Sequence, residues 1–262
     1  MSFDIYRAQV RAEGWSFWQQ RNLNAQRLND VEARDLTTDL RSDAVDLYFK
    51  GALSASEAIN SVAKKHYSWA TVKLYYAVFY FLRSTLAAKQ IALLRHLRSF
   101  VYVKGFSGEA FCAAGSNTTH DSVLRVTNAV FSRVDLLLSN SIESENPYIW
   151  LKEKRERINY KERYFHEPDV VDFWQAIDQT RDLEALINMY LNDVRLVYCF
   201  QEDHACLALP LKRWSLTKND LVSVGISPVL SEKQIKALGS FFRINGNARL
   251  FSLLPDYDSS CV

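Results

Sequence analysis

The stretch SWATVKLYYAVFYFLRSTLAAKQI, residues 68–91, decides the fold of this chain. Its apolar side chains recur every three or four residues, which is the period of one face of an α-helix. The stripe consists of Val72, Tyr75, Tyr76, Phe79, Leu82 and Leu86. Three small residues, Ala77, Ala87 and Ala88, allow a second helix to approach closely. A helix that is apolar on most faces belongs inside a bundle, so we predict that residues 68–91 form the axis of a helical core.

The composition of the whole chain favours a mainly α-helical fold. Its 262 residues include only 8 glycines and 5 prolines, whereas an all-β fold needs a turn signal every few residues. Hydrophobic residues make up 48%, which is enough for a substantial core. We therefore predict an antiparallel helical bundle with a small C-terminal α+β appendage. The 32 basic and 30 acidic residues nearly balance, so the overall charge makes no strong case for nucleic acid.

Periodicity and capping signals predict the elements around the axial helix. Apolar residues recur at helical spacing over Leu36–Gly51, and Ser54-Ala55-Ser56-Glu57 has the spelling of a capping box that opens a second helix ending near His66. A short strand or hairpin is predicted at Phe100–Val103. Later helices are expected to begin after Thr118-Thr119, at Asn146-Pro147 and at Asp169. The last of these is predicted to run unbroken to Tyr198.

The C-terminal part of the chain changes character. The segments CLALPLKRW, which ends at Trp214, and ARLFSLLPDY, which ends at Tyr257, are predicted as short strands. Between them, Thr217 and Ser231 are predicted to cap two short helices. The predicted division is an aromatic N-terminal arm at 1–30, the helical bundle at 31–200 and the α+β appendage at 201–262.

The sequence offers no sign of a membrane segment or a metal site. The N-terminus lacks an apolar signal core, and no apolar run approaches membrane-spanning length. The four cysteines, Cys112, Cys199, Cys206 and Cys261, form no CxxC pair. We therefore expect a cytoplasmic protein with reduced thiols, no metal, no cofactor and no contact with a membrane.

The best candidate for binding nucleic acid is KEKRERINYKERYFHEPD, residues 152–169. Cations can neutralise phosphates and aromatic rings can stack on bases, and this segment interleaves both. The residues proposed for this role are Arg155, Arg157, Tyr160 and Arg163. Four glutamates lie among the basic residues, so a solvated, ion-paired helix end is the competing interpretation.

The same segment carries the best catalytic hypothesis. A metal-independent ribonuclease needs a general base and a cation that stabilises the phosphorane. His166 is the candidate base because Lys161 and Arg157 lie near it in the sequence. His120 lies at a predicted helix start, where backbone amides would lower its pKa. Motifs for phosphate loops, zinc proteases and serine hydrolases are absent from the sequence.

Three short motifs in their order resemble the HEPN superfamily (higher eukaryotes and prokaryotes nucleotide-binding). Residues 74–89, with LYYAVF followed by Arg83 and LAAK, resemble its "YYAxF…R…LLxxKG" helix. Residues 119–123, THDSV, resemble its "THGxV" segment, and residues 155–160, RERINY, resemble its "RxxADY" segment. The resemblance covers about residues 35–200.

The resemblance implies an antiparallel bundle of four or five helices, often paired as a dimer. Such domains occur in toxin–antitoxin, abortive-infection and anti-phage systems, and active members are metal-independent ribonucleases with an Arg-x(4–6)-His signature. This chain departs from that signature, because no arginine lies five to seven residues before any histidine. Lys161 precedes His166 by five, but lysine lacks the planar fork of arginine.

We therefore expect a non-catalytic HEPN-like subunit of a prokaryotic anti-phage defence or toxin-type complex. It would act by binding a protein partner or a second copy of itself, with RNA or a nucleotide as a further ligand. Trp15, Phe17 and Trp18 are the expected interface anchors, since aromatic residues dominate interfaces. One alternative is a divergent metal-independent ribonuclease that uses His166 with Lys161 or Arg157. Another is a structural adaptor with no role in nucleic-acid binding.

Overall fold

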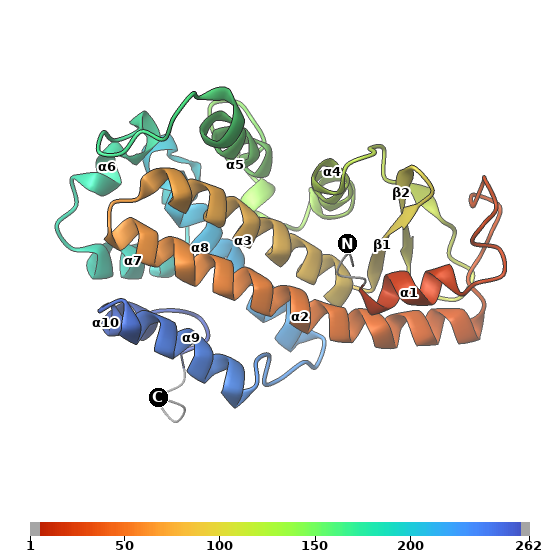
Figure 1. Ribbon diagram of the computed structural model, residues 1–262. Helices are drawn as coiled ribbons and strands as arrows, with labels where there is room; N and C mark the ends of the chain where they lie inside the picture. Colours follow the sequence, from red (N-terminus) through yellow and green to blue (C-terminus); the bar gives the residue numbers. More distant parts are fainter. Residues whose placement is uncertain (1–5, 258–262) are drawn as a thin grey trace.

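The computed structural model describes residues 6–257, and it is mainly helical, as the sequence predicts. Two long helices, α2 (Asp30–Ala63) and α3 (Tyr67–Ala88), form an antiparallel pair, and α8 (Glu202–Ser223) packs against them from behind in Figure 1. Nearly all of α3 is buried, which confirms its place at the axis of the bundle. Within residues 6–257, no helix has both the length and the apolar character needed to cross a bilayer.

Helix α2 is a single rod, and the predicted capping box lies inside it. Asn29 caps its start by accepting hydrogen bonds from the backbone N–H groups of Val31 and Glu32, and Glu32 bonds back to the Asn29 N–H. Ser54 instead donates to the Lys50 carbonyl one turn earlier, at 2.8 Å. A serine that bonds in this way sits inside a helix without ending it, so the prediction of a break at Ser54 was wrong.

A small antiparallel sheet follows α3 and covers one end of the bundle. Strands β1 (Ile91–His96) and β2 (Ser99–Lys104) form a hairpin in which Leu93 lies opposite Tyr102, and β3 (Cys112–Ala113) extends it. The strand predicted at Phe100–Val103 is confirmed as part of β2. Helix α1 (Arg7–Glu13) lies beside this sheet and along the first half of α2, at the right of Figure 1.

The predicted starts of the next two helices are confirmed. Thr118 caps α4 (Thr119–Phe131) by accepting from the Asp121 N–H, and Asn146 caps α5 (Pro147–Glu156). A short 3-10 turn, η1 (Leu136–Leu138), joins them, and α5 continues into a π-helical turn, η2 (Arg157–Lys161).

The prediction of one long helix from Asp169 to Tyr198 was wrong. That segment contains η3 (Asp172–Trp174), α6 (Gln175–Asp178), α7 (Leu183–Asn192) and η4 (Val197–Phe200). Asp182 accepts from the Ala185 N–H and starts a new helix, so the local cap overrides the apolar period that spans the segment.

Helix α8 replaces the strand predicted at CLALPLKRW. A continuous apolar run reads the same for a buried strand and for a helix buried on most faces, and α8 is the latter. Its Trp214 stacks on Phe81 of α3 and donates to the Tyr48 hydroxyl of α2 at 2.9 Å. The segment predicted as a second strand forms α10 (Ala248–Phe251) and turns. Residues 201–257 thus contain no strand, and α8 belongs to the bundle and not to an appendage.

The capping predictions in this region had mixed outcomes. Ser231 caps α9 (Glu232–Ile244) in a capping box with Gln234, as predicted. Thr217 lies inside α8 and donates to the Arg213 carbonyl one turn earlier, so its prediction as a cap was wrong.

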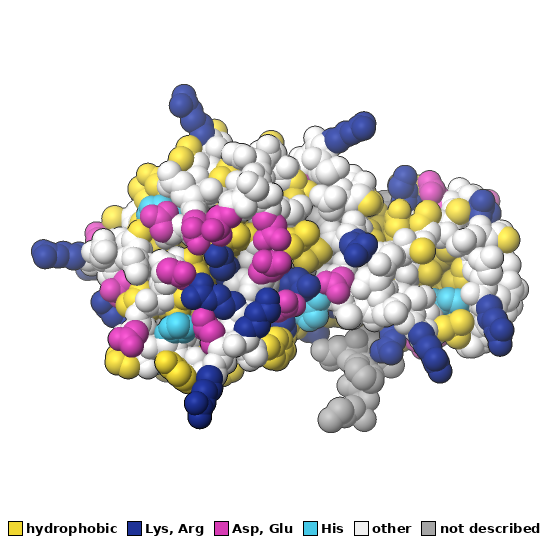
Figure 2. Space-filling model, turned by 90° about the horizontal axis from the view of Figure 1, so that it is seen from above, with side chains coloured by type: hydrophobic (Ala, Val, Ile, Leu, Met, Phe, Trp, Pro, Cys, Tyr) yellow, Lys and Arg dark blue, Asp and Glu magenta, His cyan; other side chains and the backbone are white. Residues whose placement is uncertain are grey.

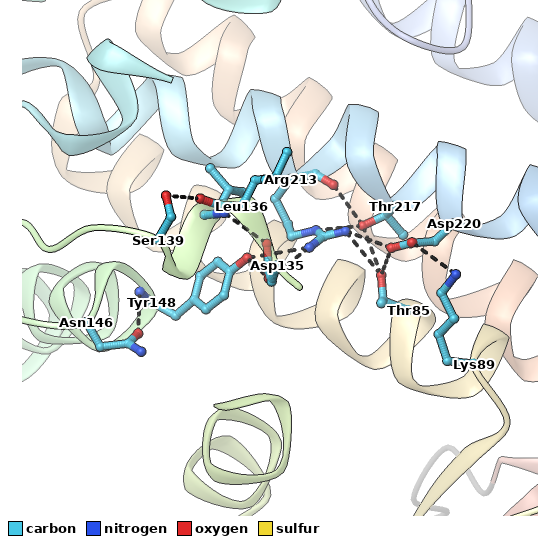
Figure 3. Close-up of polar contacts among 11 residues, drawn as sticks. Thr85, Lys89, Asp135, Leu136, Ser139, Asn146, Tyr148, Arg213, Thr217 and Asp220 are labelled. Atoms are coloured by element: carbon cyan, nitrogen blue, oxygen red, sulfur yellow. Dashed lines mark hydrogen bonds and ion pairs between the residues drawn. The ribbon is translucent and has the colours of Figure 1, made fainter. Parts of the chain in front are cut away.

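A buried ionic network fixes α8 to its neighbours. The guanidinium of Arg213, which is 3% exposed, pairs with Asp135 beside η1 at 3.1 Å and with Asp220 at 2.9 Å (Figure 3). The hydroxyls of Thr85 on α3 and Thr217 accept further hydrogen bonds from it. Two carboxylates neutralise this arginine, which is the usual condition for burying a charge.

Candidate functional site

The three motif segments that resemble the HEPN superfamily meet at one place. Tyr75 and Tyr76 come from the middle of α3, His120 from the first turn of α4, and Arg155 from the last turn of α5. The His120 Nδ1 lies 2.8 Å from the Tyr75 hydroxyl, and Arg155 Nη2 donates to the Tyr76 hydroxyl at 2.9 Å. Residues up to 80 positions apart in the sequence therefore form one polar cluster.

Arg155 is the unusual member of this cluster, because it is buried without a counter-charge. Its side chain is 6% exposed, and its guanidinium lies between the rings of Tyr75, Tyr76 and Tyr160 at 5.2, 5.3 and 5.0 Å. Its Nε is buried and has no hydrogen-bond partner. No carboxylate among residues 6–257 pairs with it. Burying a cation without an anion costs free energy of folding, and an anion bound to Arg155 would offset that cost.

His120 is held next to this positive charge. Burial lowers the pKa of its imidazole, and the charge of Arg155 lowers it further. Its neighbour Asp121 would act in the opposite direction, but Lys152 pairs with Asp121 at 2.8 Å. The ring also packs on Phe79, with 4.4 Å between the centroids. Burial and the charge of Arg155 therefore both favour the neutral imidazole. The lowered pKa has the predicted direction, but burial is its main cause, in place of the backbone amides of the helix start.

A large open cavity begins at this cluster. It has a volume of about 1060 Å³, and its lining includes Tyr76, Phe79 and His120. Arg83, on the next turn of α3, also lines it and donates to the Tyr6 hydroxyl at 3.3 Å. In the described part of the chain, Arg83 has no carboxylate partner either. Two guanidinium groups without carboxylates thus lie near one imidazole.

The predicted catalytic residues are differently placed. His166 and Arg157 are both bound to one carboxylate, that of Glu162, and Arg157 is also held by both oxygens of Asp172 at 3.0 Å. The third residue, Lys161, is exposed at the end of η2. Because two acids already neutralise Arg157, this group offers no spare guanidinium for a phosphate.

The predicted nucleic-acid residues do not form one patch. Arg155 and Tyr160 are in contact, whereas Arg157 is ion-paired and Arg163 lies exposed in the loop after η2. Two lysines of this segment are paired as well, Lys152 with Asp121 and Lys154 with both Glu143 and Glu202. Figure 2 shows acidic and basic side chains interleaved across this face, and no continuous basic surface.

The predicted interface anchors lie in the protein's own core. Trp15, Phe17 and Trp18 are 9%, 9% and 5% exposed, and all three rings pack against Phe111, which precedes β3. Trp18 also packs on His96 of β1, with 5.0 Å between the ring centroids. The three aromatic rings are therefore buried against other parts of the same chain, and in this conformation they are not exposed to a partner.

Sequence reasoning missed the pairing of His120 with Arg155. The sequence shows His120 at a predicted helix start and Arg155 among the basic residues of 152–169, but it gives no local sign that the two lie close together. The signal that could have joined them is the resemblance itself, since each residue occupies one of its motifs. The role of Arg83 had no local signal, because a single arginine in an apolar helix gives no partner.

Within residues 6–257, no three His, Cys, Asp or Glu side chains are grouped so as to hold a metal ion. Comparison of the chain with known protein families, with curated proteins and with solved structures finds no significant match.

Proposed function

We propose that this protein is a HEPN-like subunit of a prokaryotic anti-phage defence or toxin-type complex that binds RNA or a nucleotide at the Arg155–His120 cluster. The observation that carries the proposal is the buried guanidinium of Arg155, which has no carboxylate partner in the described chain and leaves its Nε without a hydrogen bond. A phosphate would satisfy both needs at once. The assignment to a defence complex rests on the motif resemblance.

The surroundings of Arg155 fit a nucleotide better than a bare anion. The ring of Tyr160, which is 67% exposed, lies 5.0 Å from the guanidinium. An exposed aromatic ring beside a phosphate-binding cation is a platform on which a base can stack. The hydroxyl of Tyr76, already bonded to Arg155, provides a further polar group for a ribose or phosphate oxygen.

The test is the binding of a fluorescein-labelled oligouridine, measured by anisotropy at low salt. We expect Arg155→Met to weaken binding by about tenfold or more, because a hydrogen-bonded charge contributes roughly 1.5–3 kcal/mol. Arg155→Lys keeps the positive charge, so its affinity for oligouridine should lie between that of the wild type and that of Arg155→Met. Arg249→Met, which removes an exposed arginine from α10, is the matched control and should leave affinity unchanged.

Wild-type affinity should fall as salt rises, because phosphate binding releases counterions. A wild-type protein that binds no oligouridine or uridine nucleotide at low salt would refute the nucleic-acid role and leave the structural adaptor. Equal affinity in Arg155→Met and wild type would refute the site.

A second candidate function, a divergent metal-independent ribonuclease, is favoured by the lowered pKa of His120 near Arg155. When His120 Nδ1 donates to the Tyr75 oxygen, Nε2 keeps its lone pair and can accept a proton from a ribose 2′-hydroxyl. The freed 2′-oxygen would attack the phosphorus while Arg155 stabilises the negative charge of the phosphorane. The P–O5′ bond would then break, so that the 5′-oxygen leaves and takes a proton from water, and the other product is a 2′,3′-cyclic phosphate.

Cleavage of RNA in excess EDTA separates this candidate from binding alone. Activity that persists in EDTA, disappears in His120→Ala and survives in His166→Ala would establish it at the His120 site. Loss in His166→Ala alone would place catalysis at His166, as the sequence predicts. No cleavage by the wild type would leave the binding proposal as the function.

A further inference from the structure

The cavity extends well beyond the Arg155 cluster, and its far part is lined by apolar side chains together with polar ones such as Gln9, Glu13 and Arg95. It runs between α1, α3 and the β1–β2 hairpin. The apolar residues along this part include Leu47, Leu86, Ala87, Ile91, Leu93 and Phe100. With a volume of about 1060 Å³ in total, it can enclose the body of a small organic molecule.

Arg83 is the single cation among the described residues of α3 that faces this apolar space. Its guanidinium lies 4.2 Å from the centroid of the Tyr6 ring and 5.5 Å from that of Phe79. It donates a hydrogen bond to a phenol, the Tyr6 hydroxyl at 3.3 Å, and no ion pair joins it to a carboxylate among residues 6–257. Two carboxylates pair with Arg213, whereas no described carboxylate lies within ion-pair distance of Arg83. Asp43, which also lines the cavity, attracts Arg83 from beyond that distance and is itself bonded to the backbone of Arg7 and Ala8.

Tyr6 covers Arg83 from the start of α1, where ionic and polar contacts to α2 hold the chain. Asp43 of α2 accepts from the backbone N–H groups of Arg7 and Ala8, both at 3.0 Å. The Arg7 side chain pairs with Asp46 at 2.6 Å, and Arg11 pairs with Asp39 on the same face of α2. These partly exposed ion pairs are weak individually and are screened by salt.

The other end of this segment is attached differently. Directly after α1, Trp15 and Trp18 are buried in the aromatic cluster around Phe111. Apolar burial of that kind is not weakened by competing ions. The cover is therefore fixed at its C-terminal end and held by replaceable polar contacts at Tyr6.

We propose that this cavity is a second binding site, for a small amphipathic organic anion. The anionic group pairs with Arg83 in place of Tyr6, and the apolar body lies along Leu86, Ile91 and Phe100. Tyr6 and α1 form the cover that such a ligand displaces. The ligand would occupy the Arg83 end of the cavity, whereas Tyr76 and His120 of the Arg155 cluster line its other end. Its binding does not depend on RNA binding.

A matched pair of probes tests the charge at this site. The anionic dye 1-anilinonaphthalene-8-sulfonate and the neutral N-phenyl-1-naphthylamine share one ring system, so their affinities differ through the sulfonate. We expect Arg83→Met to weaken binding of the anionic dye about tenfold or more and to leave the neutral dye unchanged. Arg83→Lys should retain most of the affinity for the anionic dye.

The two sites are distinguished with the same proteins. Arg155→Met should lose oligouridine binding and keep the anionic dye, whereas Arg83→Met should lose the dye and keep oligouridine. Tyr6→Ala should speed association of the anionic dye, since the cover is shortened. An equal loss of both ligands in Arg83→Met would show one shared site and overturn the proposal, as would an equal loss of the two dyes.

A competition on the wild type covers the case in which Arg83→Met does not fold. Octanoate and octylamine carry the same chain with opposite charge. Octanoate should displace the anionic dye at concentrations where octylamine does not. Equal displacement by the two, or none by octanoate, would overturn the proposal without any variant.

Discussion

His120 and Arg155 show how a single side chain acquires its properties from residues far away in the sequence. Burial lowers the pKa of His120, and Arg155 adds to the effect across 35 positions of sequence. The neighbour that the sequence displays, Asp121, acts in the opposite direction but is occupied by Lys152. The sequence at 118–122 therefore predicts where His120 lies, at a helix start, but not the cation that faces it.

The first prediction concerns the titration of His120. Its pKa in the folded protein should lie below the ordinary histidine value of about 6.5, because both burial and Arg155 disfavour the imidazolium. Histidine side-chain NMR as a function of pH measures this directly. Arg155→Met should raise the pKa toward the ordinary value, and saturating uridine monophosphate should raise it in the wild type. No change with the ligand would place the nucleotide away from His120.

The same shift predicts how stability depends on pH. Because the folded pKa of His120 is lower than the unfolded one, the unfolded chain binds more protons below about pH 6.5. The contribution of this group is complete above the unfolded pKa and is lost as pH falls below it. His120→Gln should therefore lose less stability than the wild type between pH 7 and pH 5, as measured by urea unfolding.

Helix α2 shows what decides the extent of an element. The sequence Ser54–Glu57 matches a capping-box motif, but the apolar face of α2 continues through it and packs on α3. Tertiary contacts therefore override the local signal for a helix start at Ser54. Gly51 packs closely against α3, since a Cβ atom there would lie 2.6 Å from the Phe81 ring. Side chains on a neighbouring helix, and not the local spelling, keep α2 continuous.

The second prediction tests both residues in α2. Gly51→Ala should destabilise the protein, because overpacking against Phe81 costs about 1–3 kcal/mol while the gain in helix propensity is about 1 kcal/mol. Ser54→Ala should leave stability nearly unchanged, whereas removing a true cap would cost about 1 kcal/mol. Urea unfolding of both variants measures these differences. A Gly51→Ala protein more stable than the wild type would contradict the close packing.

At the scale of the whole molecule, the bundle closes only when α8 is added. The division predicted at residue 200 separates α8 from the helices it packs against. Trp214 contacts both long helices, and Arg213 joins α8 to Asp135 and Thr85 (Figure 3). Residues 31–200 would therefore expose the apolar face of α3 to water.

The third prediction follows from this closure. A chain that ends at Phe200 should lose cooperative thermal unfolding and bind hydrophobic dye nonspecifically, because burial of α8 is absent. A chain that ends at Gly225 keeps α8 and is the matched control. It should unfold cooperatively with a lower Tm, since Asp256 no longer accepts from Tyr48 and Trp214. Cooperative unfolding of the shorter chain would restore the predicted division at residue 200.

The sequence alone determined the helical class, the axial helix within 68–91 and the caps at Thr118, Asn146 and Ser231, because local period and hydrogen-bonding chemistry depend on neighbouring residues. The end of the axial helix at Ala88, three residues before the predicted one, is decided by the strand that begins at Ile91. Only the tertiary structure decided that α2 is unbroken, that α8 is central, and that Arg155 meets His120. Those outcomes depend on which side chains, distant in the sequence, are buried against one another in the folded protein. A continuous apolar run or a single arginine does not indicate which distant residues it will contact in the tertiary structure.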